Sequence, residues 1–516
     1  MDNMYKYQML ISISIISLIF DNIPKMLQLN TISSGLANKF AWYPLFLLFL
    51  LKVIEFYKGK TKLGIKEKNQ IKFIGLLLCV FLICNIQGLL IYPYYAELLS
   101  GPLSQIEKLP HLLQFLQQHN ITLSVQSIFM SWIGVRVVKG TISNVLYTFG
   151  FSFILYLIIK KYYPTYIKLL DKCITVSIYI ILVYSCIELF YLAGSPVAKS
   201  ILETINPFLH PIAVDHGWWP PLLWKGQLRS VFSEPSRMGN YAAFALPFLW
   251  IQTLKLKKIL SLKSTLLLFY TFLIFMTKAR TPVAMYWGLL GLFVITVIAF
   301  TRKKYLRQIV GILAVSVLSL LLSIGFIKIF MVQHQEITVE SYLSDNVGSL
   351  TKGNVRSNGA RYALIRSNFK TGIEHPVFGV GDQLTSSYTV HNFNEYDLQN
   401  KEVQLWVRSF KERGVLRYGL NAMNEYISKF AQYGIVGLLN YLFPLFFILI
   451  QLFHKLKHTN GDEQLDTLAV TLSLIGSAVA GCNGSLMLLY SYWVILAYAY
   501  ADIYQETPQI QRLDKK

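Results

Sequence analysis

The chain has 516 residues, of which 54% are hydrophobic and only 15% charged, and its formal net charge at pH 7 is +21. Soluble domains carry about a quarter charged residues, so this composition excludes an ordinary soluble domain and indicates a polytopic membrane protein. Many of the basic residues lie in short connections between apolar runs, and no RNA- or DNA-binding module interrupts these runs. We therefore expect no nucleic-acid partner.

Twelve apolar runs are candidates for membrane spans. Backbone groups inside a bilayer must form their hydrogen bonds within the protein, so these spans are predicted to be helices. The expected fold class is an all-α polytopic integral membrane protein with about 12 transmembrane helices. The runs cover roughly residues 8–21, 40–57, 71–92, 141–159, 173–193, 238–254, 264–277, 282–300, 309–332, 434–453, 467–482 and 485–501.

Basic residues cluster in the short connections after even-numbered runs, which the positive-inside rule places in the cytoplasm together with both termini. The clusters contain Lys52, Lys58, Lys60, Lys62, Lys66, Lys68, Lys72, Lys160, Lys161, Lys168, Lys172, Lys255, Lys257, Lys258, Lys263, Arg302, Lys303, Lys304 and Arg307. We divide the chain into residues 1–332 with nine spans and the outer loops 93–140 and 194–237, a large and partly helical outer loop at 333–433, and residues 434–516 with three spans and a cytoplasmic tail.

Three segments within the outer loops, and the cysteines, have expectations of their own. Residues 103–119 have helical spacing and are expected on the membrane surface, and residues 207–221 on an aromatic, proline-rich outer loop. Residues Ile121–Val138 are apolar and fit a re-entrant piece; a thirteenth span is rejected because it would place the later basic clusters outside. The cysteines lack metal-ligand spacing and are expected to pack in the spans. They are Cys79, Cys84, Cys173, Cys186 and Cys482.

The first candidate site lies at the entry to the sixth span, between Arg229 and Asn240. A Glu234-Pro235-Ser236 step before an apolar run predicts a helix start, with Pro in the first turn and Ser as the cap. One interpretation is this cap alone, with Arg237 paired to Glu234. The other is an anion site, because a helix N-terminus favours negative groups and the guanidinium groups of Arg229 and Arg237 bind phosphate.

The second candidate is the short connection Lys278-Ala279-Arg280-Thr281-Pro282 between spans seven and eight. Two cations in an external hairpin oppose the charge rule, so either a function or contact with lipid headgroups holds them there. Two more candidates follow in the large loop. Asn358-Gly359-Ala360-Arg361 leads through a helical pattern to the glycine turn His375–Gly381, and Asn421–Gly437, with Asn424 inside it, runs into the tenth span.

Together these pieces resemble the O-antigen ligase/polymerase superfamily. The resemblance rests on their order, on their spacing relative to the spans and on the large outer loop, and it covers about residues 225–440. The matching pieces are Arg229…Phe232-Ser-Glu234-Pro235-Ser236, Ala279-Arg280-Thr281, Gly359-Ala-Arg361, His375-Pro-Val-Phe-Gly379-Val-Gly381 and Asn424-Glu-Tyr…Gln432-Tyr-Gly434-Ile-Val-Gly437.

The resemblance implies a twelve-helix glycosyltransferase of the bacterial cytoplasmic membrane that uses no metal, no nucleotide sugar and no cofactor. Its implied donor is a polyprenyl-pyrophosphate-linked oligosaccharide, and membrane lipid and a chain-length regulator are its further partners. The ligase branch of the superfamily has His-Asn where this chain has Met423-Asn424, and His391-Asn392 lies too far from Gly434 to replace it. We therefore favour the polymerase branch, with the ligase as the alternative.

The expected reaction is attack of a sugar hydroxyl on C1 of the donor sugar, and negative charge builds on the departing diphosphate. A fixed guanidinium stabilises that charge more in the transition state than in the ground state, and Arg can do so bidentately without a metal. We assign this role to Arg229, Arg280 and Arg361. Arg237, Arg136, Lys278, His375 and Asn424 are the expected substrate-binding residues. Glu234 is the candidate base, an assignment that competes with its place at the helix start.

A transporter or flippase for the same lipid-linked saccharides is the main rival. It would carry paired charges inside its spans and repeated halves, whereas Glu188 and Lys328 are nearly the only ionisable residues near span interiors here. A metal-dependent glycosyltransferase with an acidic first outer loop has only Asp21 in its favour.

Overall fold

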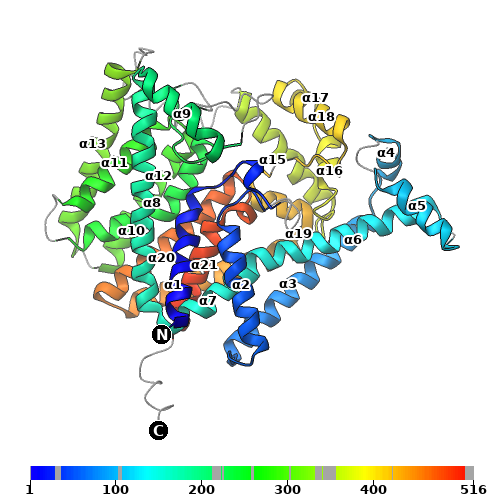
Figure 1. Ribbon diagram of the computed structural model, residues 1–516, viewed down its shortest axis with the longest axis horizontal. Helices are drawn as coiled ribbons and strands as arrows, with labels where there is room; N and C mark the ends of the chain where they lie inside the picture. The colour runs from blue at the N-terminus through cyan, green and yellow to red at the C-terminus, as the bar shows by residue number, and fades with distance from the viewer. Residues whose placement is uncertain are drawn as a thin grey trace, which may run out of the picture.

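The computed structural model describes residues 2–29, 36–102, 107–121, 123–211, 222, 226–256, 261–301, 304–331, 340, 356–420 and 422–505. Within these ranges every regular element is a helix, as predicted (Figure 1). The long helices are α1 (Asp2–Ile16), α2 (Trp42–Tyr57), α3 (Ile65–Leu90), α6 (Val125–Val145), α8 (Tyr163–Leu192), α10 (Pro235–Leu254), α11 (Leu262–Met276), α12 (Arg280–Thr301), α13 (Leu306–Phe330), α15 (Arg356–Glu374), α19 (Glu425–His458), α20 (Gly461–Ala480) and α21 (Tyr490–Tyr504).

The chain is a multi-pass membrane protein. Of the described residues, six helical segments are long and apolar enough to cross a bilayer, and two shorter apolar segments, Met4–Ile19 and Leu262–Met276, accompany them. The six are Ile65–Leu90, Val125–Leu192, Arg280–Thr301, Leu306–Phe330, Glu425–His458 and Gly461–Asn483. Each of the twelve predicted runs overlaps a helix, but the count of twelve spans and the sides of the loops stay predictions.

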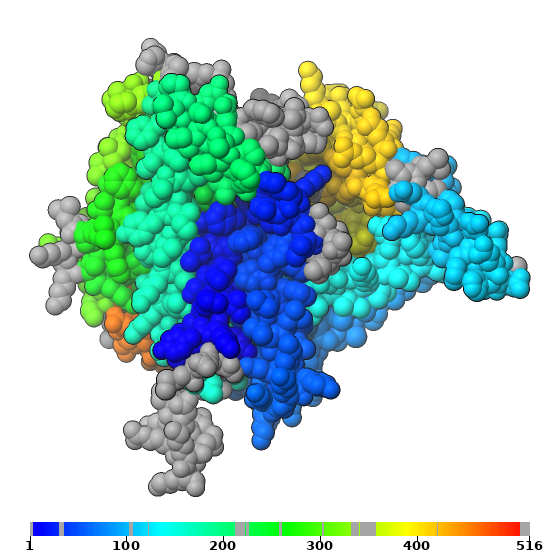
Figure 2. All heavy atoms as spheres, viewed as in Figure 1, coloured from blue at the N-terminus to red at the C-terminus, as the bar shows by residue number. Residues whose placement is uncertain are grey.

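The re-entrant piece expected at Ile121–Val138 is wrong. Ser124 caps α6 by accepting from the N–H of Ser127, and α6 continues through a π-helical turn, Leu146–Gly150, into α7 (Phe151–Ile159). The apolar segment is thus the first part of the helix that contains the fourth predicted span. The short helices α4 (Tyr95–Ser100) and α5 (Leu109–Gln118) lie beside its start, and this part of the molecule protrudes to one side (Figure 2).

Helix α10 lies at the centre of the bundle and brings the first candidate site to one end of it. Nearly all of its side chains are buried, and it packs against α20, α12 and α11. Small residues permit this close packing, because a Cβ on Gly239 would lie 2.7 Å from Pro282 of α12 and one on Gly476 of α20 would lie 2.7 Å from the carbonyl of Ala243.

Several helices lie at the end of the bundle away from the start of α1 (Figure 1). They are α9 (Pro196–Leu209), α15, α16 (Thr385–His391), α17 (Glu395–Leu398) and α18 (Lys401–Arg413). The last four belong to the predicted large loop, and α15, α16 and α18 share a small apolar core that includes Ala360, Leu364 and Val403. The aromatic loop expected at 207–221 and the first part of the large loop lie mostly outside the described residues.

The glycine turn after His375 is an anchor between the large loop and the membrane helices. Helix α19 is interrupted at Gly434, where φ is +60° and ψ is −164°. Through this break the N–H groups of Ile435 and Val436 donate to the carbonyls of Pro376 and Val377, over 2.8 and 3.3 Å. In return, the N–H groups of Val380 and Gly381 donate to the carbonyls of Ala431 and Gln432, over 3.0 and 2.8 Å.

Glycine is required on both sides of this anchor. A Cβ on Gly434 would lie 2.3 Å from the carbonyl of Val377, and one on Gly379 would lie 2.5 Å from the carbonyl of Gln432. Both glycines also have positive φ, a conformation that other residues rarely adopt. The turn that resembles the family motif therefore fixes the loop to α19, and the loop carries Arg361 on α15.

Candidate active site

The first predicted constellation forms the N-terminal turn of α10. Glu234 is the N-cap residue and Pro235 the first helical residue, so the predicted helix start is confirmed. The expected cap at Ser236 is wrong, because Ser236 lies inside the helix and its Oγ donates to Oε2 of Glu234 over 3.1 Å. The expected Arg237–Glu234 pair is also replaced, since Nε of Arg237 lies 3.8 Å from Oδ2 of Asp21.

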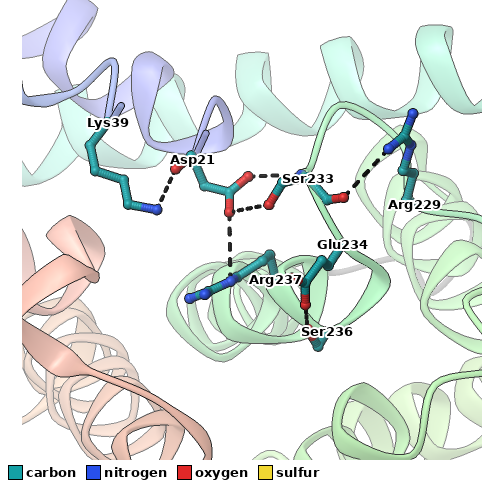
Figure 3. A network of polar contacts seen from close by, with 7 residues as sticks. All are labelled: Asp21, Lys39, Arg229, Ser233, Glu234, Ser236 and Arg237. Atoms are coloured by element: carbon teal, nitrogen blue, oxygen red, sulfur yellow. Dashed lines mark hydrogen bonds and ion pairs between the residues drawn. The ribbon is translucent and has the colours of Figure 1, made fainter. Parts of the chain in front are cut away.

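Asp21 connects the turn of α10 to the segment between α1 and α2 (Figure 3). Its carboxylate accepts from the N–H and the Oγ of Ser233, over 2.9 and 2.8 Å. Lys39 donates from Nζ to the backbone carbonyl of Asp21. This carboxylate therefore holds Arg237 and the chain just before α10 in place, a role that was not predicted for Asp21.

Lys39 is the residue of this group that sequence reasoning missed. It is 6% exposed, and burial lowers the pKa of its amine to about 8, with the charge of Arg237 acting in the same direction and that of Asp21 against it. A cavity of about 30 Å³, enough for one water molecule or hydroxyl, is lined by Asp21, Lys39 and Arg237 and by Asn240 and Tyr490. The available hint was that Lys25 and Lys39 both lie in a connection that the charge rule places outside.

Arg229 has a different environment from the one predicted for it. It is 2% exposed, and its Nη1 donates to the carbonyl of Ser233 over 3.5 Å. Its N–H and that of Ser230 donate to Oε2 of Glu188 on α8, over 3.2 and 2.7 Å. The guanidinium is thus buried in the bundle, close enough to the carboxyl group of Glu188 for the two to interact, rather than facing the outer surface.

Arg280 and Arg361 form the second group. Nη1 of Arg280, the first residue of α12, donates to Oδ1 of Asn358 on α15 over 2.8 Å. Nη1 of Arg361, one turn further along α15, donates to Oδ1 of Asn483 over 2.8 Å. The two guanidinium groups are close enough for their charges to interact, and both side chains are partly exposed. Two like charges held together in this way are suited to a doubly charged anion.

Lys278 precedes this pair in a left-handed backbone conformation, with φ at +48°. For a residue with a Cβ such a conformation costs about 1–2 kcal/mol, and strained residues of this kind are often found at functional sites. Its Nζ lies 4.0 Å from the position that a Cβ on Gly226 would occupy. The tight turn between α11 and α12 thereby directs a third cation toward the segment that precedes α10.

A short chain segment connects the two groups. Helix α20 ends in the turn Gly481–Asn483, which holds Arg361, and the next turn, Leu486–Leu488, leads to α21. Leu488 and Leu489 line the small cavity beside Lys39 and Arg237. The Gly239–Pro282 contact joins α10 and α12 within a turn of each start. The Arg280–Arg361 group and the Lys39–Arg237 group therefore both lie near the N-terminal turn of α10.

The remaining predicted residues have other surroundings. Asn424 caps α19 by accepting from the N–H of Ile427 over 3.1 Å, and its Nδ2 lies 3.5 Å from the carbonyl of Cys482, beside the turn that holds Arg361. His375 packs edge-on against Tyr388, with ring centroids 5.5 Å apart, inside the anchor. Arg136 on α6 lies over the ring of Trp132 at 5.0 Å and is not among the contacts of either group.

Metal-ligating side chains do not cluster in the part of the chain that the structure describes: no group of three or more His, Cys, Asp or Glu residues there could hold an ion. The groups that could bind an anion are guanidinium and ammonium groups, together with the N–H groups at the start of α10.

One family model matches the part of the chain that contains Arg280 and Arg361. Residues 265–442 match the family model for O-antigen ligase (Wzy_C), which confirms the resemblance to the O-antigen polymerase/ligase superfamily over this part of the chain. Members of this family are glycosyltransferase-like membrane enzymes. No curated protein matches the chain. The matched residues include Lys278, Arg280, Arg361, His375 and Asn424, whereas Lys39, Asp21 and Arg237 lie outside them.

Proposed function

Taking the O-antigen ligase-like domain as the premise, we propose that the chain polymerises oligosaccharide repeat units carried on polyprenyl pyrophosphate. The product is a surface polysaccharide of the O-antigen or capsule type, made on the outer face of a bacterial cytoplasmic membrane. The proposal includes twelve spans, both termini in the cytoplasm, and membrane lipid and a chain-length regulator as partners. The positive-inside pattern supports this orientation.

The single observation that carries the proposal is the Arg280–Arg361 pair. These residues come from α12 and α15, 81 positions apart in sequence, and asparagine side chains hold both guanidinium groups. A guanidinium matches the geometry of phosphate oxygens and needs no proton transfer to carry its charge. Lys278 and the N-terminal turn of α10 add positive potential at the same end of the helices.

The proposed reaction follows from this arrangement. A hydroxyl oxygen of the acceptor sugar forms a bond to C1 of the donor sugar, and the bond between C1 and the phosphate oxygen breaks. The electron pair leaves with the diphosphate, whose growing charge Arg280 and Arg361 stabilise. The hydroxyl proton passes to a base, for which Glu234 remains the candidate. Among the described residues its carboxylate accepts one side-chain hydrogen bond, from the uncharged hydroxyl of Ser236.

Arg229 is better explained as a structural residue in this proposal. Its burial beside Glu188 removes it from the diphosphate, while Arg237, held by Asp21, is 31% exposed and can reach a substrate. We therefore place Arg280 and Arg361 on the diphosphate, and Arg237 and Lys39 beside Asp21 at the start of α10 as a further positively charged part of the site.

Loss of the gene separates the polymerase from its two alternatives. We expect deletion to leave single repeat units on the carrier or on the surface lipid, as resolved by gel electrophoresis of labelled lipid-linked saccharides. Full-length polymer accumulating on the polyprenyl carrier would instead establish a ligase. Absence of any repeat unit on the outer face would establish a flippase.

The lowered pKa of Lys39 predicts a pH dependence. The amine is charged below about pH 8 and neutral above it, so its contribution to the anion site is lost as pH rises through that value. We expect polymerisation by the reconstituted protein to fall about fivefold over the first pH unit above this pKa, because the charged fraction of the amine falls from about a half to about a tenth. Lys39→Met should remove this transition, while Lys25→Met, an exposed lysine of the same connection, should keep it. The same pH profile for Lys39→Met and the wild type would exclude the role of Lys39.

A further inference from the structure

A second cavity lies at the other end of the bundle from the candidate active site. It has a volume of about 320 Å³ and is lined by α3, α7, α19 and α21. Its walls are mainly aromatic and include Phe73, Phe149, Phe153, Phe443, Phe447 and Tyr500. The lining residues of α3 come from the first turns of that helix, and those of α21 come from its last turns. Arg280 lies at the start of α12, at the opposite end of the bundle.

The surface around this cavity is apolar. Leu76 of α3 and Phe446 and Ile450 of α19 are 55%, 56% and 66% exposed. In a chain that crosses a membrane such residues face lipid, so the cavity opens toward the acyl chains of the bilayer. The side chains that line an empty apolar cavity lack van der Waals contacts on one side, and an acyl chain in the cavity would supply them.

One end of the cavity is polar and positively charged. Lys66 lines it and its Nζ lies 4.7 Å from the centre of the Tyr504 ring. Nε2 of Gln70, also in the lining, is buried without a hydrogen-bond partner among the described residues. The adjacent Lys160 is instead neutralised by Glu67, at 2.8 Å. An ammonium group and an amide donor at the mouth of an apolar chamber match a lipid that has a phosphate in its headgroup.

We propose that this cavity binds an anionic phospholipid, with one acyl chain between α3, α7, α19 and α21 and the phosphate against Lys66 and Gln70. The exposed lysines that precede and begin α3, among them Lys58, Lys60 and Lys62, attract anionic headgroups to this end. The acyl chain packs against α19 at Pro444, where the helix lacks one backbone hydrogen bond. The lipid therefore braces the helix whose other end holds the large loop.

Lys66 and Lys68 provide a matched pair for the test. Both are exposed on the first turn of α3, but Lys66 lines the cavity and Lys68 points to another face of the helix. The purified full chain is stripped of lipid, mixed with vesicles of phosphatidylglycerol or phosphatidylcholine, and examined by native mass spectrometry. We expect phosphatidylglycerol to be retained in preference to phosphatidylcholine. Lys66→Glu should reduce that retention about tenfold, and Lys68→Glu should leave it within about twofold.

A substitution inside the cavity tests the acyl-chain site separately. Ser152→Trp fills the chamber and should abolish retention of phosphatidylglycerol; should this variant not fold, Phe447→Trp replaces it. Equal losses in Lys66→Glu and Lys68→Glu, or equal retention of both lipids, would overturn the proposal. Displacement of phosphatidylglycerol by equimolar polyprenyl phosphate would overturn it in favour of the substrate lipid. These outcomes do not depend on whether the chain is a polymerase.

Discussion

Replacing Arg280 by Ala is expected to abolish chain growth while the protein remains inserted and abundant. The guanidinium is held toward Arg361 and takes up charge that develops on the departing diphosphate, and removal of one such group from a preorganised site typically costs about 10²–10³-fold in rate. Arg280→Lys should fail as well, because an ammonium group cannot bind two phosphate oxygens in the planar geometry of a guanidinium. The measurement is the length distribution of surface polysaccharide, beside the amount of protein in isolated membranes.

Lys370→Ala is the matched control for this prediction. Lys370 is an exposed cation on α15, the helix that carries Arg361, and among the described residues its one ion pair is a surface pair with Glu374 at 3.9 Å. Exposed pairs of this kind contribute about 0–1 kcal/mol, so Lys370→Ala should give normal polymer. Normal polymer lengths in an Arg280→Ala strain would remove Arg280 from the mechanism.

The second large effect is expected from Gly434→Ala. The φ and ψ of Gly434 belong to a region that is almost confined to glycine, and the added Cβ would lie 2.3 Å from the Val377 carbonyl. The substitution should therefore open the anchor between α19 and the large loop at a cost of about 3 kcal/mol or more. We expect a marked fall in the melting temperature of the detergent-solubilised protein and loss of polymerisation.

Gly75→Ala provides the comparison. Gly75 lies within α3, and a Cβ there would meet no atom within 4 Å. Alanine is favoured over glycine inside a helix by about 0.5–1 kcal/mol, so this variant should melt at the same or a slightly higher temperature. If Gly434→Ala melts like Gly75→Ala, the anchor does not contribute to stability as described.

Most of the helical architecture follows from local sequence. Runs of apolar residues identify the helices of the bundle, and the Pro235 step gives the start of α10 correctly. The extent of α6 was missed because Arg136 and Lys139 interrupt the apolar pattern, although both lie on exposed positions of the helix. Periodicity indicates that a helix is present but does not show which of its faces meets other helices.

The site residues were predictable where a charge opposed its local context or lay in a motif. Arg280 stood out because its hairpin is basic on the outer side, and Arg361 because it lies in a motif. Lys39 and the burial of Arg229 depend instead on contacts with Asp21 and Glu188, which are distant in sequence. Likewise, the His375–Gly381 turn was recognisable as a turn, but its partner is a break in α19 more than fifty residues later.

The central claim is that Arg280 and Arg361 bind the diphosphate of the lipid-linked donor. The most direct measurement is an electron cryo-microscopy structure of the protein in a lipid nanodisc with polyprenyl diphosphate bound. The account predicts that phosphate oxygens lie within hydrogen-bonding distance of both guanidinium groups, about 2.7–3.2 Å, beside the N-terminal turn of α10. A diphosphate bound away from both arginines, for example beside Lys66 at the other end of the helices, would contradict it.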